Sequence, residues 1–370
     1  MNKKTLRGII FIVILTLITP TLAIAESQNQ IPEQEADIIF FAEVLQLIMD
    51  RYPFEAKESD LIEAALRGML QSLDPYSDYY TKEEAESMYG SLLGTFSGIG
   101  VHIEEKDGYI NVVKILKGQP AEKAGLKKDD LIISVDDIDI KDLGLTKVSA
   151  MIKGPKDTKV KLGIKRGEKL LTIEVTRKII LINPVHYEIL EKDIGYIQLD
   201  EFNTQTTLEI NKALKEFDNK RVKKIILDLR DNPGGLLDQA ISASKLFVPR
   251  GPIVHVREKG KALVTHTSTL AKSKYKLVVL VNENSASASE IFAGAIKDRK
   301  AGTLVGTKTF GKGLVQSIYP ILDGSMIKLT IAEYLTPNKI SINGKGIEPD
   351  ILVENTEEDL QLLKAIEILK

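Results

Sequence analysis

The chain lacks cysteine altogether and has only four histidines among its 370 residues. Without cysteine it has no disulfide, no thiolate nucleophile and no cysteine-ligated zinc site. The histidines show neither an HExxH motif nor a paired spacing, and they are His102, His186, His255 and His266. Because zinc sites in proteins use such clustered ligands, we expect no metal and no other cofactor.

The sequence also lacks an excess of charge of either sign. Fifty lysines and arginines against 52 aspartates and glutamates leave a net charge of -2, with both signs interspersed. Such a pattern offers no basic face and no acidic tail, so we expect no nucleic-acid partner. With 43% hydrophobic residues and no low-complexity tract, the length predicts two or three globular domains with hydrophobic cores.

Residues 1–25 have the pattern of an export signal. Three basic residues lie within the first seven, residues 8–22 are almost wholly apolar, and residues 23–25 are Ala-Ile-Ala, which suits cleavage. An uncleaved inner-membrane anchor is the alternative, although an apolar span of about 15 to 18 residues is short for a bilayer helix. Both interpretations predict an exported protein of the periplasm or cell envelope, and membrane association through the N-terminus stays open.

Residues 26–95 have a helical pattern without a catalytic constellation. Apolar spacing predicts helices over 36–52, 59–73 and 81–93. Thr81 and Glu84 have the spacing of a capping box at the start of the third helix. We interpret this region as a helical interaction module, through which a homodimer could form.

Residues 96–180 change to short strands with glycine-rich turns, one helix over 145–152 and a hairpin through Arg166 and Gly167. The segment SGIGV at 97–101 and the run GQPAEKAGLKKDDLIISVDD resemble a PDZ domain. The resemblance implies that an extended peptide adds to the strand after the glycine loop, where amides hold its terminal carboxylate. The peptide-binding residues would be Gly98, Ile99, Gly100 and Val101.

The remaining chain alternates strands and helices, as an α/β core does. Strands are predicted at 193–202, 224–229 and 277–281, with helices at 206–217, 236–247 and 287–300. A strand-rich stretch follows, and the last helix falls within 355–370.

Ser287 lies at a predicted strand-to-helix turn. A serine there is near helix N-terminal amides that stabilise a developing anion, which is where a hydrolase places its nucleophile. The alternative is structural, because Ser287 and Glu290 have the spacing of a capping box and the serine could merely begin the helix.

Lys312, between two glycines, is the candidate base for Ser287. A free lysine has a pKa of about 10.4, which burial lowers, and a serine–lysine pair is a recognised variant of the catalytic triad. Gln316, four residues on, could orient the amine without adding a charge. Residues 306–312 also match the GxxxxGK opening of a nucleotide-binding loop, but Gly313 replaces the required Ser or Thr and a strand pattern follows, which disfavours nucleotide binding.

Several sequence blocks occur in the order typical of one family, and they are SLDPYSDYYT, LDLRDNPGGLL, NENSASASEIFAGA, GTKTFGKGLVQ and INGKGIEPDILV. With the PDZ-like segment between the first two, the chain resembles the carboxyl-terminal processing peptidases, or tail-specific proteases. The resemblance implies a catalytic core of the crotonase and Clp protease type. It also implies roles for five residues: nucleophile Ser287, base Lys312, orienting Gln316, and oxyanion-hole amides of Gly235 and Ala288.

Two positions depart from the family pattern. Tyr76 stands where histidine is common, and Lys153 stands where arginine is usual. Neither position belongs to the serine–lysine pair, although Lys153 leaves in doubt any signalling from the PDZ-like domain that uses an arginine.

The predicted fold class is therefore multidomain α+β. Its parts are an export signal (1–25), a helical region (26–95), a PDZ-like β-rich domain (96–180), a serine peptidase domain (181–354) and a C-terminal helix (355–370). The expected function is an exported serine endopeptidase that recognises protein or peptide substrates by their accessible C-termini. A catalytically silent PDZ adaptor of the cell envelope is the alternative.

Overall fold

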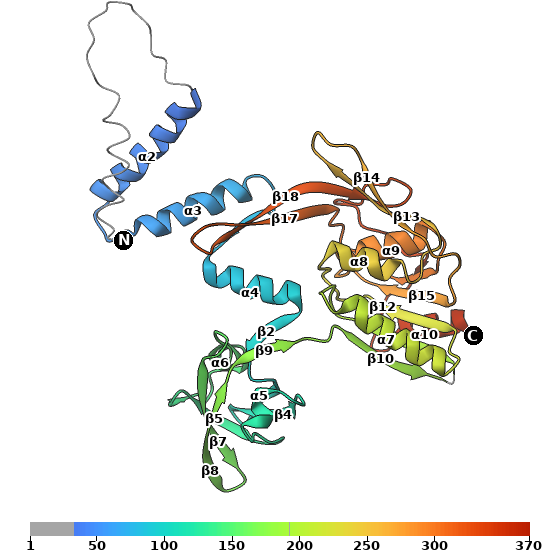
Figure 1. Cartoon of the computed structure of the whole chain (residues 1–370), viewed down its shortest axis with the longest axis horizontal. Coiled ribbons are helices and arrows are strands. Elements are labelled where there is room, and N and C mark those ends of the chain that lie inside the picture. The colour runs from blue at the N-terminus through green and yellow to red at the C-terminus, as the bar shows by residue number, and fades with distance from the viewer. Residues whose placement is uncertain (1–32, 192) are drawn as a thin grey trace, which may run out of the picture. The chain divides into compact units, whose positions relative to one another are not determined.

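The computed structural model describes residues 33–191 and 193–370, so the predicted export signal lies outside the described residues. None of the helices in these two ranges is long and apolar enough to cross a membrane. The chain divides into two units, the first ending at Leu66 and the second running from Arg67 to Lys370. Figure 1 shows the chain with many of its helices and strands labelled.

The predicted N-terminal helices are confirmed as α2 (Glu33–Arg51), α3 (Glu58–Gln71) and α4 (Lys82–Leu93). The capping box of α4 is formed, because the Thr81 N–H donates to Glu84 Oε2 at 2.8 Å and the Glu84 N–H donates to Thr81 Oγ1 at 3.4 Å. Helix α2 exposes many apolar side chains, among them Ile38, Phe40 and Leu47.

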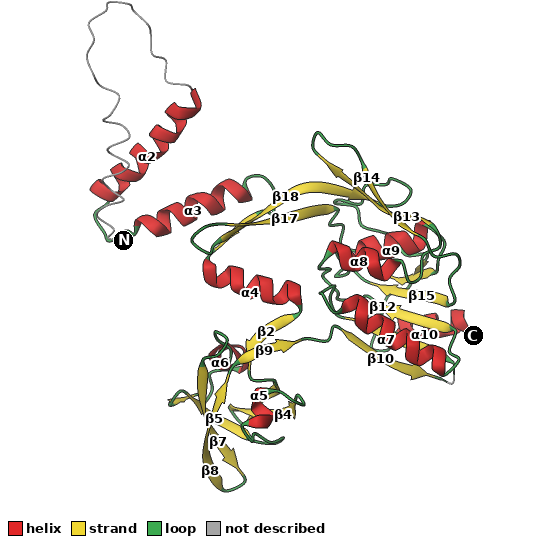
Figure 2. Cartoon of the chain, viewed as in Figure 1, coloured by secondary structure: helices red, strands yellow, loops and turns green. Residues whose placement is uncertain are grey.

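The PDZ-like region is a sheet of short antiparallel strands (Figure 2). Its strand order is β3 (Val101–Lys106), β4 (Tyr109–Ile115), β5 (Leu131–Val135), β7 (Lys159–Arg166) and β8 (Lys169–Thr176). The remaining elements are β6 (Ile138–Asp139), which pairs with β5, and the helices α5 (Pro120–Lys123) and α6 (Leu145–Ile152). The chain enters and leaves through the antiparallel pair β2 (Thr95–Gly98) and β9 (Lys178–Leu181).

The sequence alternation explains why this sheet has one buried face. Along β7 the apolar residues Val160, Leu162 and Ile164 are buried, because alternate side chains of a strand point to the same face. Strand β3 is at the end of the strand order, so its outer edge is free to pair with an added strand.

The α/β core contains a six-stranded sheet that is parallel except for its first strand. Its order is β10 (Val185–Leu190), β11 (Ile194–Leu199), β12 (Lys224–Asp228), β15 (Lys276–Val281), β16 (Thr303–Gly306) and β19 (Ile351–Leu352). Its helices are α7 (Thr206–Asn219), α8 (Leu237–Ser244), α9 (Ala288–Asp298) and α10 (Leu360–Leu369).

The two faces of this sheet pack on different helices. Ile225 and Leu227 of β12 belong to the core cluster that contains residues of α7, α8 and α9, whereas Ile226 packs with Ala365 and Leu369 of α10. Because parallel strands end at the same edge, the loops after β12 and β15 lie together at the carboxyl edge of the sheet.

A second, antiparallel sheet adjoins these loops. Its strands are β1 (Asp78–Tyr80), β13 (Gly251–Glu258), β14 (Val264–Ser268), β17 (Leu314–Pro320) and β18 (Met326–Leu335). The long strand β18 pairs with β17, β13 and β1, with Asp78 opposite Lys328. It therefore brings the segment before α4 beside the chain that follows residue 312.

Candidate active site

The three serines of the strand-to-helix turn have different surroundings. The Ser285 hydroxyl donates to the Leu229 carbonyl at 2.7 Å and the Ser289 hydroxyl to the Asn232 carbonyl at 3.0 Å, and both serines are fully buried. Ser287 is half-buried and has a φ of 53°, which is strained for a residue with a side chain. Such strain concentrates at functional sites, and Ser287 is the serine of this turn that lines a cavity.

The glycine loop after β12 passes directly against this turn. A Cβ atom on Gly234 would lie 2.8 Å from Ser287 Cβ and 2.9 Å from the Ala288 nitrogen. One on Gly235 would lie 2.2 Å from the carbonyl oxygen of Phe202. A side chain at either position would therefore clash, with the Ser287 turn at Gly234 and with Phe202 at Gly235. Both glycines also have a positive φ, which residues with a side chain rarely adopt.

The side chain of Asn232 holds the glycine loop in place through hydrogen bonds. It is fully buried, donates to the Leu199 carbonyl at 2.7 Å and accepts from the Gly234 N–H at 2.9 Å. The main-chain carbonyl of Asn232 accepts from the Ala286 N–H at 3.1 Å. Asn232 thereby joins the loops after β11, β12 and β15, a role that its place in the sequence did not indicate.

Lys312 lies two residues before β17 and is half-buried. Burial lowers the pKa of its amine from the ordinary 10.5, and the nearby cation of Lys328 lowers it further, while Asp74 and Glu290 act in the opposite direction. The Nζ atom lies 4.5 Å from the centroid of the Tyr76 ring. Burial and Lys328 thus increase the fraction of neutral amine, which is the form that a general base requires.

Glu290 ties the main chain of Ser287 to the loop that carries Lys312. It is only 1% exposed, and its Oε2 atom accepts from the N–H groups of Ser287 at 2.9 Å and Lys312 at 2.8 Å. Its Oε1 atom accepts from Thr309 Oγ1 at 2.6 Å and from the Gly311 N–H at 2.7 Å. The carboxylate therefore contributes to a helix cap, as the capping-box alternative predicted, and also links two distant segments.

Tyr334 supports the same two residues from the carbonyl side. Its hydroxyl, on a side chain that is 2% exposed, donates to the carbonyl of Ser287 at 3.0 Å and to that of Lys312. Burial raises the pKa of Tyr334 well above its ordinary value of 10.0, so it stays a donor.

The sequence pattern indicated Glu290 only as the partner of Ser287 in a capping box and did not single out Tyr334. A signal existed for Glu290, since it is the one charged residue in the run 288–296, all of which is buried. Nothing in the sequence distinguishes Tyr334 from other strand tyrosines.

A cavity of about 670 Å³ brings the predicted site residues together. Its lining includes Ser287, Lys312, Gln316, Gly235 and Ala288. Much of the remaining wall is apolar, with Met88, Leu237, Ile291, Val315 and Ile331 among its residues. The four histidines, all of which the structure describes, are not part of this lining.

Gln316 bonds to a different residue from the one expected. Its Nε2 atom donates to Thr330 Oγ1 at 3.1 Å, and that hydroxyl donates to Asp74 Oδ1 at 3.2 Å. The Gln316 side chain thus lines the cavity and bonds across β17 and β18 to Thr330, not to Lys312.

The nucleotide-binding alternative for residues 306–312 has no support in the geometry. The chain continues from Gly313 directly into strand β17, so no helix N-terminus follows the loop to receive a phosphate.

The predicted peptide-binding residues surround the start of β3. Gly98 ends β2, Ile99 is buried in the PDZ core, Gly100 has a φ of 80°, and Val101 begins β3. The glycine loop therefore lies next to the free edge of β3, as peptide addition requires.

Removing the Glu290 carboxylate should weaken both the fold and the site. Glu290→Ala leaves the three amides and one hydroxyl without their acceptor, so we expect the free energy of unfolding to fall by about 3 to 5 kcal/mol. Urea denaturation measures this. Glu283→Ala, an exposed glutamate of the same turn, should change it by less than about 0.5 kcal/mol; equal losses in the two variants would contradict the role of Glu290.

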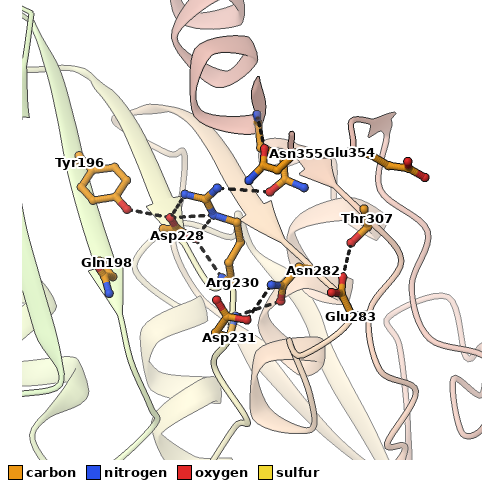
Figure 3. Close-up of a pocket in the computed structure, with 11 residues that line it drawn as sticks. Tyr196, Gln198, Asp228, Arg230, Asp231, Asn282, Glu283, Thr307, Glu354 and Asn355 are labelled. Carbon is orange, nitrogen blue, oxygen red and sulfur yellow. Dashed lines mark hydrogen bonds and ion pairs between the residues drawn. The ribbon is translucent and has the colours of Figure 1, made fainter. Parts of the chain in front are cut away.

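A polar network occupies the α10 side of the same carboxyl edge (Figure 3). Arg230 donates to Asp228 Oδ2 at 2.6 Å and, beyond the end of the sheet, to Asp359 Oδ1 at 2.7 Å; the Tyr196 hydroxyl also donates to Asp228, at 2.7 Å. Tyr196, Asp228 and Arg230 line a second cavity of about 560 Å³. The network attaches the segment before α10 to the loop that leads to the glycines.

Arg230 should therefore be important for stability. Arg230→Met leaves the carboxylate of Asp228, whose side chain is 5% exposed, without its cation, so the free energy of unfolding should fall by about 3 to 5 kcal/mol. Arg257→Met is the matched control because its pair with Glu333 is half exposed, and it should cost at most about 1 kcal/mol. Denaturation curves that coincide for the two variants would rule out a structural role for the network.

Comparison with known proteins assigns the core and its added domains. The model of peptidase family S41 matches residues 193–353, that of the PDZ domain residues 97–176, and that of the activating protease CtpB N-terminal domain residues 18–84. A Staphylococcus epidermidis protein named as a CtpA-like serine protease is 37% identical over 352 residues, which cover 94% of this chain and 72% of that protein.

The chain belongs to the CtpA-like serine proteases of peptidase family S41. A CtpA-like serine protease of Staphylococcus aureus is 39% identical over 307 residues, covering 81% of this chain and 62% of that protein. The solved photosystem II D1 C-terminal processing protease is 29% identical, with a TM-score of 0.51 over 89% of this chain and 90% of that one. The multidomain fold and the serine peptidase class predicted from sequence are thereby confirmed.

Proposed function

We propose that this S41 peptidase cleaves peptide bonds with Ser287 as nucleophile and Lys312 as general base. The observation that carries the proposal is that the two residues line one cavity while Glu290 and Tyr334 bind the main chain of both. The lowered pKa of Lys312 supports it, because a serine hydroxyl needs a neutral base for activation.

The chemistry follows from the positions of these groups. Neutral Lys312 accepts the Ser287 proton as Oγ attacks the scissile carbonyl, and the N–H groups of Gly235 and Ala288 bind the oxyanion. The protonated amine then gives its proton to the leaving nitrogen. In the second half of the reaction neutral Lys312 takes a proton from the attacking water and returns it to Ser287 Oγ as the bond of that oxygen to the acyl carbon breaks. Gln316 would orient the amine after exchanging its bond to Thr330 for one to Nζ.

The substrate would be a protein or peptide with an accessible C-terminus. The free edge of β3 and the adjacent glycine loop suit an added strand that ends in a carboxylate. The apolar wall of the catalytic cavity suits apolar side chains of such a tail. The name of the D1 processing protease describes action at a C-terminus, which fits the same substrate class.

The N-terminal part of the chain suggests where the protein acts and how it assembles. The pattern of residues 1–25 supports export to the periplasm or cell envelope, with the membrane as a further contact. The exposed apolar side chains of α2 support a homodimer through the N-terminal helices.

Mass spectrometry of protein tails tests the proposed function. Extracts or purified envelope proteins are incubated with the wild-type chain or with Ser287→Ala, and C-terminal fragments are mapped. We expect fragments with apolar new ends that appear only with the wild type. Binding of C-terminal peptides without any cleavage between pH 6 and 9 would instead support the silent adaptor.

A further inference from the structure

An aromatic ring faces the amine of Lys312. The ring belongs to Tyr76, whose centroid lies 4.5 Å from Nζ, within the range of a cation–π interaction. At this distance the ring attracts the ammonium form, whereas a neutral amine gains little from it.

The main chain around Tyr76 is firmly held, so the ring has a defined place. Asp74 Oδ1 accepts from the N–H groups of Tyr76 at 2.8 Å and Ser77 at 2.9 Å. The Ser77 hydroxyl, on a side chain that is 1% exposed, accepts from the Thr330 N–H at 3.0 Å. These bonds attach residues 74–77 to β18, next to the strand that follows Lys312.

A second lysine is held by the same segment. Lys328 Nζ donates to the Tyr80 hydroxyl at 2.5 Å and lies 5.0 Å from the centroid of that ring. The two cations that line the cavity, Lys312 and Lys328, thus each contact a different tyrosine, four residues apart. Residues 76–80 therefore contact both amines, Lys312 through the ring of Tyr76 and Lys328 through Tyr80.

We infer that Tyr76 is a positioning residue for Lys312, holding the amine by its ring and stabilising the ammonium that forms when Lys312 accepts the Ser287 proton. This inference rests on the proposed function. The ring makes the base stronger, since it stabilises the positive charge that develops on Nζ, and it fixes the position of the resulting ammonium.

Other charged and titratable groups also face Lys312. Lys328 on β18 opposes the ammonium, Asp74 and Glu290 favour it, and the Tyr334 hydroxyl contacts its main chain. Tyr76→Leu alters none of these charges, so its effect on titration isolates the ring.

The experiment titrates the full chain labelled with ¹³Cε-lysine, with the Lys312 signal assigned by its loss in Lys312→Ala. We expect Tyr76→Leu to lower the pKa of Lys312 by about half a unit to one unit. The acid limb of kcat should move with it, kcat at its plateau should fall several-fold, and KM should stay unchanged. Tyr76→Phe should match the wild type because it keeps the ring.

A matched control is Tyr79→Leu, which removes a ring that lies 5.7 Å from Arg67 instead and should leave the Lys312 signal unchanged. Tyr76→Met gives the same test if the leucine variant does not fold. A Lys312 titration identical in Tyr76→Leu and wild type, or a Tyr76→Phe variant that behaves like Tyr76→Leu, would overturn the inference. Cleavage retained by Lys312→Ala would instead overturn the proposed function, and the titration distinguishes the two failures.

Discussion

Replacing Ser287 with alanine is expected to lower kcat/KM for peptide cleavage by about 10⁴-fold or more. No acyl-enzyme can form without the hydroxyl, and the remaining amides and base only supply the residual catalysis that such sites retain. The fold should survive, because Glu290 and Tyr334 contact only the main chain of Ser287. Peptide binding by the PDZ domain should therefore be unchanged.

Steady-state cleavage of a fluorogenic peptide with an apolar tail measures this effect. Ser289→Ala is the matched control from the same turn. Its hydroxyl donates to the Asn232 carbonyl, so its loss should cost about 1 kcal/mol of stability and leave most of the activity. The assignment of the nucleophile fails if Ser287→Ala still cleaves at a tenth of the wild-type rate or better.

Lys312→Arg is expected to be nearly as inactive as Lys312→Ala, with losses of about 10⁴-fold in kcat/KM. Arginine keeps the positive charge and the length but cannot supply a neutral base. If Lys312 only stabilised negative charge, the Lys312→Arg enzyme would keep much of its activity. Comparing the two variants therefore distinguishes a general base from a stabilising cation. Lys308→Arg, an exposed lysine of the same loop, should remain active.

The pH dependence gives an independent test of the base. A lysine that acts as a general base must be neutral. We therefore expect kcat/KM to be low at pH values under the pKa of Lys312 and to rise as the pH increases through that pKa. Burial and Lys328 lower that pKa from the ordinary 10.5. In profiles measured from pH 6 to 10, the acid limb of kcat/KM should therefore lie below pH 10.5. An unchanged profile in a variant without Lys312 would contradict the assignment.

Local patterns in the sequence were sufficient to predict most helices and strands. The capping box of Thr81 and Glu84, helix α6 and the strand before Ser287 all depend on residues within one or two turns of each other. Their boundaries differ by a few residues at most, as for α8, which is Leu237–Ser244 where a helix over 236–247 was predicted.

Contacts between distant segments could not be predicted in the same way. The Glu290 bonds to residues 309–312 depend on how the loop before β17 returns to α9, and the Tyr334 contacts depend on the pairing of β17 with β18. The bond of Gln316 to Thr330 likewise follows from strand register, which includes a bulge at Val315 and Gln316. Sequence spacing placed Gln316 at the site but carried no information about its partner.

The most direct test of the central claim is to trap the acyl-enzyme and locate it. The wild-type chain is mixed with an activated ester of an apolar-tailed peptide, quenched in acid within the first turnover, digested and sequenced by mass spectrometry. We expect the acyl mass on the fragment that contains Ser287, at that residue, and a loss of the adduct in Ser287→Ala. An adduct on any other residue that turns over at the catalytic rate, or hydrolysis without an adduct, would contradict the account.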